Sequence, residues 1–402
     1  MTRLTALFFA NAFLVVGLCT AASGMDTKTS PPLGNAYSFL YGQMDKYQQG
    51  ATLRLIQSFV PTSTFDNGDI SYTYDDAVTV IALLRRGRAN DLKRAKVLGD
   101  SLVYVQTHDP SADGRVRAGY HAKRLIEDDG SPNIAGATSD TGNLAWTGMA
   151  FVQLYHVTGQ ATYRTAAEAI ANFIQMNTYD TRGAGGYTGG IKADQTKITY
   201  KSTEHNIDLY ALFSMLAQTT GDQSWADDAQ HALVFTEAMW NSNKGNFYIG
   251  TGNDGVAINK SDPTPEDVQT WSYLSTGLGK YQGSIDWAVN NLWATSGAFE
   301  GLSFEVKDRS GVWFEGTAHA AAALEARDLS GDEQSAEKFL SDIETGQAKA
   351  PNADGKGIDA ASKDGLKTGD GGDEYFASLH IGATSWYCLA KQAANPFRLI
   401  SP

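Results

Sequence analysis

The chain has 402 residues, a formal net charge of −13 at pH 7, and an aromatic content of 11%. The acidic balance argues against a nucleic-acid partner, because proteins that bind phosphate backbones carry basic patches. The length is sufficient for two or three ordinary domains, or for one large all-helical toroid.

The N-terminus has the pattern of a secretory signal peptide. Arg3 gives a short positive region, residues 4–18 are mostly apolar, and small or polar residues follow. The apolar run is too short for a stable membrane span, and Leu18 lies where a lipoprotein signal requires a small residue. We predict that residues 1–24 are removed and that the protein is secreted or periplasmic, with no membrane attachment after cleavage. A membrane anchor is the alternative.

A pair of helices recurs along the remaining chain. In residues 206–240, a helix that is apolar on all sides is followed by a short polar turn and an amphipathic helix. Residues 36–59 can supply one further amphipathic helix at the front. The apolar helices are expected to begin near six positions: Asp75, Asn143, Asn206, Gln269, Gly316 and Ser378.

Twelve alternating helices predict an all-α fold, an (α/α)6 toroid of six helical hairpins, formed by residues 25–402 as a single domain. The apolar helices would form an inner ring and the amphipathic helices an outer ring. An open solenoid is the alternative, but it requires polar capping repeats, and neither end has that composition. The links that lead back to inner helices are long, so one face should carry the long loops and the functional site.

Carboxyl groups gather at the predicted mouths of the inner helices. Glu204 and Asp208 are four residues apart and share a helix face. Asp75 and Asp76 form an adjacent pair, which exceeds what helix capping needs. Glu315 lies in an apolar setting, which would raise its pKa.

Aromatic and polar side chains accompany these acids. One carboxylic acid beside a second carboxylate, among aromatic rings, is typical of sites that cleave glycosidic bonds. The structural alternative is that acids in a first helical turn only stabilise the helix, and it has most weight for Asp140 and Asp267. The residues expected to bind substrate are Tyr72, Tyr74, Trp146, Tyr200, His205, Asp208, Trp271, Trp313, His319 and Tyr375.

Metal and cofactor motifs are missing from the sequence. His205, His319 and His380 each stand near an inner-helix start, but no HExxH or paired-histidine spacing occurs. The chain also has no phosphate loop and no dinucleotide fingerprint. We therefore predict that the protein needs neither a metal nor a cofactor.

The helix pattern from Ala36 to Ala394 resembles the six-hairpin (α/α)6-barrel glycosidases. The segment "YTYDDAVTVIALL" is similar to the helix-opening Asp-Asp segment of the endo-α-1,6-mannanase-type families. In those families the adjacent aspartates are nucleophile and acid/base, so the resemblance implies these roles for Asp75 and Asp76. The same barrel also hosts polysaccharide lyases and sugar epimerases, so the fold alone does not determine the reaction.

We predict a secreted, monomeric glycoside hydrolase that acts on a poly- or oligosaccharide. The catalytic pair is expected among four acids: Asp75, Asp76, Glu204 and Glu315. Glu204 would be the general acid, and an aspartate of the pair would be the base or nucleophile.

Two alternatives remain from the sequence. A polysaccharide lyase would use Tyr200 or His205 as base and Lys192 or Lys201 to neutralise a uronate. A non-catalytic carbohydrate-binding protein would use the same toroid without turnover.

Overall fold

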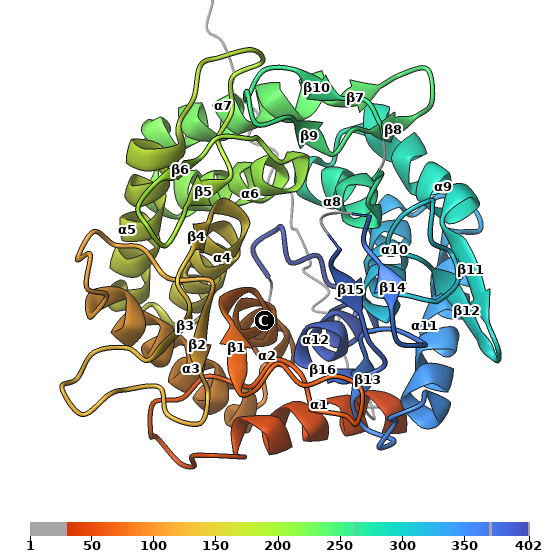
Figure 1. The fold of residues 1–402 in the computed structure, drawn as a ribbon, viewed down its shortest axis with the longest axis horizontal. Helices are drawn as coiled ribbons and strands as arrows, with labels where there is room; N and C mark the ends of the chain where they lie inside the picture. Colours follow the sequence, from red (N-terminus) through yellow and green to blue (C-terminus); the bar gives the residue numbers. More distant parts are fainter. Residues whose placement is uncertain (1–29, 262, 370–371, 401–402) are drawn as a thin grey trace, which may run out of the picture.

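The computed structural model describes residues 30–261, 263–369 and 372–400. The predicted signal peptide, residues 1–24, lies outside the described residues. Helices dominate the fold, and short strands lie in the links between them (Figure 1).

Six inner helices form a closed ring. Each inner helix contacts the next, and the last contacts the first. The ring confirms the predicted (α/α)6 toroid (Figure 1). The inner helices are α2 (Thr73–Arg86), α4 (Thr141–Thr158), α6 (Thr203–Thr220), α8 (Glu266–Thr276), α10 (Phe314–Arg327) and α12 (Ile381–Ala390).

Six outer helices surround this ring, and each packs most closely against one inner helix. The predicted first outer helix was too long, because the chain leaves the helix at Met44 and continues without regular structure. A 3-10 turn, η1 (Gly279–Tyr281), precedes α9. The outer helices are α1 (Pro31–Met44), α3 (Ala89–Thr107), α5 (Ala161–Thr178), α7 (Gln223–Ala238), α9 (Gln282–Asn291) and α11 (Asp332–Lys349).

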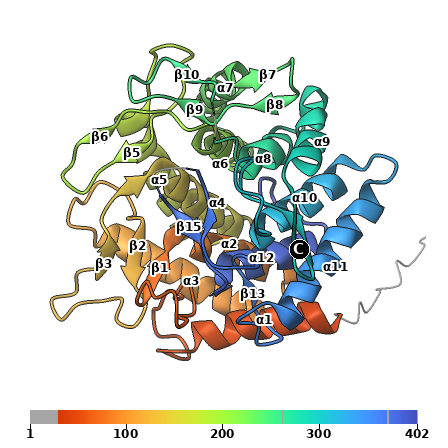
Figure 2. The same cartoon turned by 45° about the vertical axis from the view of Figure 1, so that its right-hand side comes forward.

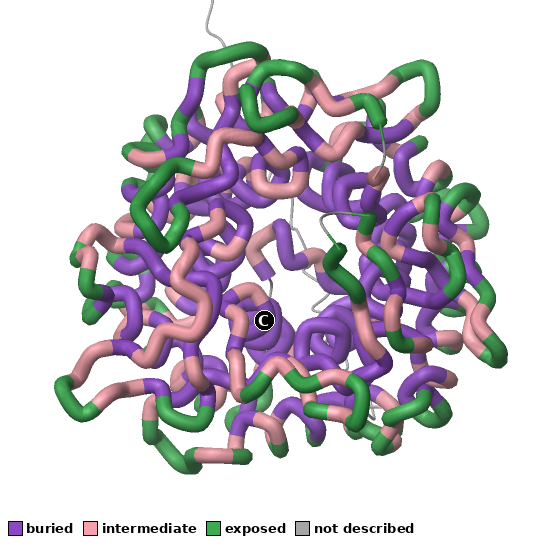
Figure 3. The backbone as a smooth tube through the Cα atoms, viewed as in Figure 1, coloured by how far each residue is buried: buried purple, intermediate pink, exposed green. Residues whose placement is uncertain are grey.

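The hydrophobic pattern explains the two rings. Inner helices such as α4 and α12 are buried on nearly all sides, whereas the outer helices expose one face to solvent (Figure 3). The turns from inner to outer helices are short. Gly159 and Gly221, which end α4 and α6, have φ angles of 68° and 73°, a left-handed conformation that glycine adopts at little cost.

The long links contain short antiparallel strands, which the sequence did not predict. Two sheets have three strands, β1–β2–β3 and β4–β5–β6, and the others are two-stranded. Strand β15 lies inside the outline of the ring (Figures 1 and 2). The strands are β1 (Ile70–Tyr72), β2 (Gly119–His121), β3 (Ile134–Gly136), β4 (Ser139–Asp140), β5 (Gly190–Ile191), β6 (Lys197–Ile198), β7 (Trp240–Asn241), β8 (Asn246–Phe247), β9 (Gly250–Thr251), β10 (Ile258–Asn259), β11 (Trp293–Ser296), β12 (Phe299–Leu302), β13 (Ile358–Asp359), β14 (Leu366–Lys367), β15 (Glu374–Tyr375) and β16 (Leu379–His380).

The C-terminal segment crosses the axis of the ring (Figure 1). It is fixed near the C-terminal ends of the inner helices. The Gln153 amide donates to the Arg398 carbonyl at 2.7 Å, and the Asn395 amide donates to the Leu274 carbonyl at 2.8 Å. This segment therefore lies at the end of the ring opposite the long links.

Phe397 from this segment completes an aromatic cluster. Its ring centroid lies 5.1 Å from Trp146, 5.5 Å from Trp271 and 6.4 Å from Trp386. Trp271 and Trp386 are stacked at 5.7 Å. We call these four rings the aromatic floor, because they fill the axis of the toroid below the inner-helix mouths.

Within the described ranges, no helix combines the length and the apolar character needed to cross a bilayer.

Candidate active site

Two adjoining chambers lie at the N-terminal mouths of the inner helices. The inner chamber has a volume of about 450 Å³, and the outer chamber has a volume of about 930 Å³. Several residues line both, and we call this shared boundary the waist. It consists of Phe59, Tyr72, Tyr200, Glu204, His205, Asp267, Phe304 and Tyr375.

The structure gathers most of the predicted site residues in one place. They come from β1, β15, the loop before α6 and the first two turns of the inner helices, which the ring directs toward a common axis. The predicted residues that line the inner chamber are Tyr72, Tyr74, Asp75, Trp146, Tyr200, Glu204, His205, Trp271, Trp313, Glu315, His319 and Tyr375.

Asp76 is not among the residues that line either chamber. Its side chain is fully buried: the Ser71 hydroxyl donates to Oδ2 at 2.5 Å and the Ile56 amide donates to Oδ1 at 3.0 Å. Burial raises its pKa to about 8. Adjacent residues of a helix point about 100° apart, so when Asp75 faces the chamber, Asp76 faces away from it. The structure therefore places Asp76 outside both chambers, and its predicted catalytic role stays a prediction.

Asp208 is also behind the chamber wall, one turn further along α6 than Glu204. Its carboxyl group is fully buried, and the Trp146 indole is the side chain that offers it a hydrogen bond. Burial and then the charges of Glu204 and Asp267 raise its pKa well above the ordinary value. Asp208 is thus buried outside the two chambers, and its predicted contact with substrate stays a prediction.

Glu315 is the centre of a hydrogen-bond network at the chamber wall. The Tyr74 hydroxyl donates to its Oε1 at 2.6 Å, and the Trp386 indole N–H donates to the Tyr74 hydroxyl at 2.8 Å. His319 Nε2 lies 3.7 Å from Oε1, and His380 Nδ1 lies 3.3 Å from Oε2. Burial would raise the pKa of Glu315, but the two imidazoles lower it far below its usual range. Glu315 is therefore ionised at neutral pH.

His380 was noticed in the sequence only as a histidine near a helix start. Its Nε2 lies 3.1 Å from Asp75 Oδ1, and Phe59 stacks on its ring at 4.1 Å. As a neutral ring it would accept from the Ala383 amide at 3.2 Å and cap α12. Burial lowers its pKa, but Asp75 and Glu315 raise it overall to about 10, which favours the charged form.

His319 is held in a similar way. Its Nδ1 lies 3.0 Å from Glu266 Oε2, and both side chains are fully buried. Burial lowers the pKa of His319, while the carboxylates of Glu266 and Glu315 raise it to about 9. The chamber thus combines two imidazolium groups with several carboxylates, a balance that keeps Glu315 charged.

The waist holds acids of a different kind. Burial, then the charge of Asp267, raises the pKa of Glu204 to about 8, and burial with Glu266 raises that of Asp267 to about 7. His205, the next residue after Glu204, has its pKa lowered by burial to about 4, so it is neutral. Asp267 was assigned mainly to capping from the sequence, but it lines both chambers. The site therefore combines two carboxyl groups with raised pKa values, Glu204 and Asp267, with one whose pKa is lowered, Glu315.

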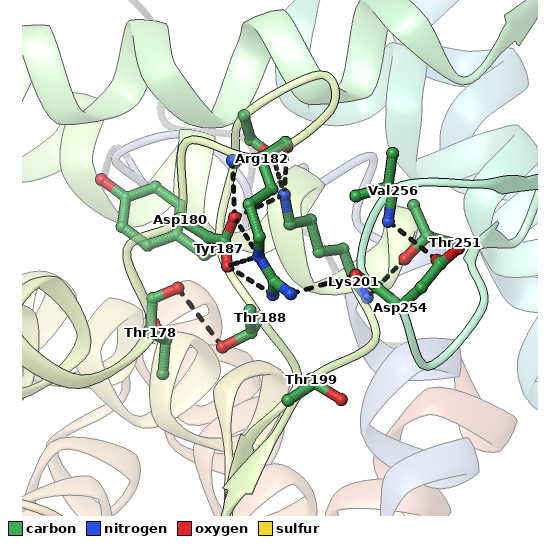
Figure 4. A network of polar contacts seen from close by, with 12 residues as sticks. Thr178, Asp180, Arg182, Tyr187, Thr188, Thr199, Lys201, Thr251, Asp254 and Val256 are labelled. Atoms are coloured by element: carbon green, nitrogen blue, oxygen red, sulfur yellow. Dashed lines mark hydrogen bonds and ion pairs between the residues drawn. The ribbon is translucent and has the colours of Figure 1, made fainter.

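Lys201 precedes α6 and was a candidate cation for a uronate substrate. Its side chain is fully buried, and Nζ lies 3.0 Å from Asp180 Oδ1. Nζ also donates to the carbonyls of Arg182 at 2.7 Å and Gly185 at 2.8 Å (Figure 4). Although Lys201 borders the outer chamber, its ammonium is committed to this network. It holds the loop that carries Tyr200 and does not meet a substrate, which weakens the lyase alternative.

Among the described residues, no group of three or more His, Cys, Asp or Glu side chains is arranged to hold a metal ion.

Comparisons with known proteins agree with this fold. Residues 98–277 match the sequence model of glycosyl hydrolase family 76. No curated protein matches the chain in sequence. Asp75 and Asp76, which carry the resemblance to an Asp-Asp motif, precede the matched range, so the match does not test their predicted roles.

Solved structures share the fold at low sequence identity. A D-mannose isomerase is 14% identical, with 92% of this chain and 98% of that chain covered and a TM-score of 0.65. A family 76 mannosidase from Bacteroides thetaiotaomicron is 15% identical, with 90% and 98% covered and a TM-score of 0.61. Cellobiose 2-epimerase from Bacillus thermoamylovorans is 11% identical, with 90% and 98% covered and a TM-score of 0.66. These structures confirm the six-hairpin, glycosidase-like fold, and the family match confirms the predicted enzyme class, a glycoside hydrolase.

Proposed function

We propose that the protein is a secreted enzyme that hydrolyses glycosidic bonds in a mannose-containing poly- or oligosaccharide. The observation that carries the proposal is the difference between the pKa values of carboxyl groups that line one aromatic chamber. Glu204 and Asp267 have raised pKa values, whereas that of Glu315 is lowered. Carboxyl groups whose environments push their pKa values apart are the acid and base partners that glycoside hydrolysis needs.

Glu204 is the general acid in this proposal. It lies at the waist, and with a pKa of about 8 it keeps its proton at neutral pH. The proton passes to the leaving oxygen as the glycosidic C–O bond breaks. The oxygen of a water molecule joins the anomeric carbon, directly or after a glycosyl-enzyme intermediate, and a carboxylate takes up the proton that water loses.

Asp75 is the second carboxylate. It lines the inner chamber, and the raised pKa of His380, whose Nε2 lies 3.1 Å from Asp75 Oδ1, places a cation beside it. Glu315 adds a second negative charge beside the position of the sugar. Both carboxylates stabilise the positive charge that develops on the ring in an oxocarbenium-like transition state.

Mannose is the proposed sugar for two reasons. The structural relatives include a family 76 mannosidase and a D-mannose isomerase, which are named for this sugar. The second reason concerns sugars in general. The matched family is described as a glycosyl hydrolase family, and aromatic side chains in the chamber, such as Trp271 and Tyr375, can stack on the C–H groups of a sugar ring.

The test is a screen of the mature protein against α- and β-linked glycans, with yeast-type α-mannan and β-mannan included. Released reducing ends and unsaturated products are measured in the same wells. Reducing ends from an α-mannan, lost in Glu204→Gln and kept in the exposed control Glu237→Gln, would support the proposal. Unsaturated products alone, or sugar binding with no product, would contradict it and favour the lyase or the binding protein.

A second candidate is a sugar isomerase or epimerase, as in two of the structural relatives. The observation that favours it is the pair of buried imidazoles, His319 and His380, in the same chamber. Their raised pKa values weigh against it, because a protonated imidazole cannot abstract a proton from a sugar carbon. Conversion of free mannose or cellobiose, followed by proton NMR without bond cleavage, would establish this activity.

A further inference from the structure

Five ionisable side chains form a continuous row along the wall of the inner chamber. Glu266 Oε2 lies 3.0 Å from His319 Nδ1, and His319 Nε2 lies 3.7 Å from Glu315 Oε1. Beyond Glu315, its Oε2 lies 3.3 Å from His380 Nδ1, and His380 Nε2 lies 3.1 Å from Asp75 Oδ1. Carboxyl and imidazole groups therefore alternate, and we call these five residues the acid–histidine row.

Glu266 occupies a different position from the other members of the row. The other four line the inner chamber, whereas Glu266 is not among the residues that line either chamber. It is the first residue of α8, and its side chain is fully buried behind the ring of His319. Glu266 can therefore influence a bound sugar only through the groups in front of it.

The pair of Glu266 and His319 shares one proton, which resides on the ring. Burial raises the pKa of Glu266, and the imidazole lowers it. Burial lowers the pKa of His319, but Glu266 and Glu315 raise it overall to about 9. The charged ring has an N–H group at both nitrogens, so Nδ1 faces Glu266 and Nε2 presents an N–H group to Glu315.

Removal of the charge on Glu266 would reverse what His319 presents to Glu315. The ring would lose a proton more readily, and the remaining proton would stay on Nδ1 as long as residue 266 offers an acceptor there. Nε2 would then direct a lone pair at a carboxylate 3.7 Å away. Two acceptors that face each other repel, so Glu315 would either take up a proton or move.

Aromatic rings prevent His319 from turning to another partner. The centroid of its ring lies 4.9 Å from that of Trp271, 5.2 Å from that of Trp313 and 4.2 Å from that of Trp386. The side chain is also fully buried. A rotation of the ring would have to displace one of these indoles, so a change in its proton count acts on Glu315 directly.

We propose that Glu266 is a positioning residue of this enzyme, which acts through His319 to keep Glu315 charged and in place beside the sugar. The inference rests on the proposed hydrolase function, and it adds a residue that does not contact the substrate. The row thus links a buried acid of α8 to the carboxylates that face the reacting sugar.

The charge on His319 also acts on the proposed general acid. Burial raises the pKa of Glu204, and the charge of His319 lowers it. Loss of that charge would therefore move the ionisation of Glu204 to higher pH. A loss of activity that moves to lower pH would report His319 and Glu315 instead. The charged groups around His319 are Glu315 on α10, Glu266 and Asp267 on α8, Glu204 on α6 and His380 before α12.

The first test measures the charge on His319 without any substrate. Nitrogen NMR of isotope-labelled histidine, with the signal identified by its loss in His319→Gln, should show a mostly charged ring at pH 8 in the wild type. Glu266→Gln keeps the shape and an acceptor but removes the charge, so the midpoint should fall by about two pH units, to near pH 7. A neutral ring in the wild type at pH 7, or a midpoint unchanged in the variant, would overturn the proposal.

The second test is the pH profile of kcat and KM on a glycan that the wild type hydrolyses. Glu266→Gln should be within threefold of wild type in kcat at pH 5 and about fivefold slower at pH 8, with KM changed less than twofold. The control is Ser275→Ala, which removes a buried hydroxyl of α8 that donates to the Ile207 carbonyl at 2.9 Å and should leave the profile unchanged. A loss by the same factor at every pH would indicate a merely structural role and overturn the proposal.

A double variant tests whether Glu266 acts through His319. In the His319→Gln background, the addition of Glu266→Gln should lower kcat no further, whereas additive losses would contradict the proposal. If the wild type hydrolyses no glycan, the hydrolase proposal fails, and the NMR titration by itself decides whether Glu266 holds the charge on His319.

Discussion

Glu204→Gln should stabilise the protein at pH 8 while it impairs the proposed reaction. Burial, helped by Asp267, raises the pKa of Glu204 from 4.5 to about 8. The same carboxyl ionises more readily in the unfolded chain, so the folded state loses relative stability as the pH rises from about 4.5 to 8. A glutamine cannot ionise, and the substitution removes this penalty.

The size of the effect follows from the pKa difference. At 1.36 kcal/mol per pKa unit, the penalty is roughly 4 kcal/mol at pH 8 and below about 1 kcal/mol at pH 5. Glu204 is partly exposed to the chamber, and water there reduces the penalty, so we expect a net gain of about 2–4 kcal/mol at pH 8. For a chain of this length, that gain corresponds to a rise in Tm of about 2–5 °C.

Differential scanning calorimetry at pH 5 and pH 8 measures this gain. The matched control is Glu237→Gln on α7, an exposed glutamate that pairs with Lys280 at the surface. The control should change Tm little, with no dependence on pH. A Glu204→Gln protein with the same Tm shift at both pH values, or a lower Tm than wild type at pH 8, would refute the burial of this acid.

Three further substitutions test other parts of the structure. Glu315→Gln removes one of the two carboxylates beside His380, while Asp75 remains as its partner. It should lower the free energy of unfolding by about 1–3 kcal/mol in urea denaturation at pH 7 and abolish turnover; full stability would contradict the network. Lys201→Met breaks the buried ion pair with Asp180, so it should lower the free energy of unfolding by about 3–5 kcal/mol and raise KM by loosening the loop before α6. Lys192→Met, at an exposed position, should change neither quantity. Phe397→Ala should cost about 3–5 kcal/mol by opening a cavity in the aromatic floor, and a change below 1 kcal/mol would show that the segment does not plug the ring.

The fold followed from the sequence because its signal is periodic. Inner helices such as α6 are apolar on all sides, and each is followed by an amphipathic partner, so ring position can be inferred from composition. Most of the chamber residues could then be predicted from the starts of the inner helices, because a closed ring brings the first turns of its helices close together. The short strands were missed, since two-residue pairings in polar links have no periodic pattern.

The roles within the site depend on features that sequence spacing does not carry. Asp75 and Asp76 are adjacent, and only the orientation of α2 shows which one faces the chamber. Asp267 has the local sequence of a capping residue, and its place at the waist depends on the packing of α8 in the ring. Lys201 is an ordinary lysine in sequence, but it becomes a buried partner of Asp180 through a loop that precedes it by about twenty residues.

The aromatic floor also could not be predicted from the sequence. The segment around Phe397 is short and irregular, so neither helical nor strand periodicity marks it. Its position depends on hydrogen bonds to Gln153 and Leu274, more than a hundred residues away. Long-range contacts of single side chains are the part of a fold that periodic patterns do not encode.

The assignment of Glu204 as general acid is tested most directly by the dependence on the leaving group. Hydrolysis of α-mannobiose and of 2,4-dinitrophenyl α-mannoside would be compared in wild type, Glu204→Gln and Glu237→Gln. Dinitrophenolate leaves without protonation, so Glu204→Gln should lose on the order of 10²–10⁴ in kcat/KM on mannobiose and less than about tenfold on the aryl substrate. Equal losses on both substrates, or no loss on mannobiose, would contradict the account.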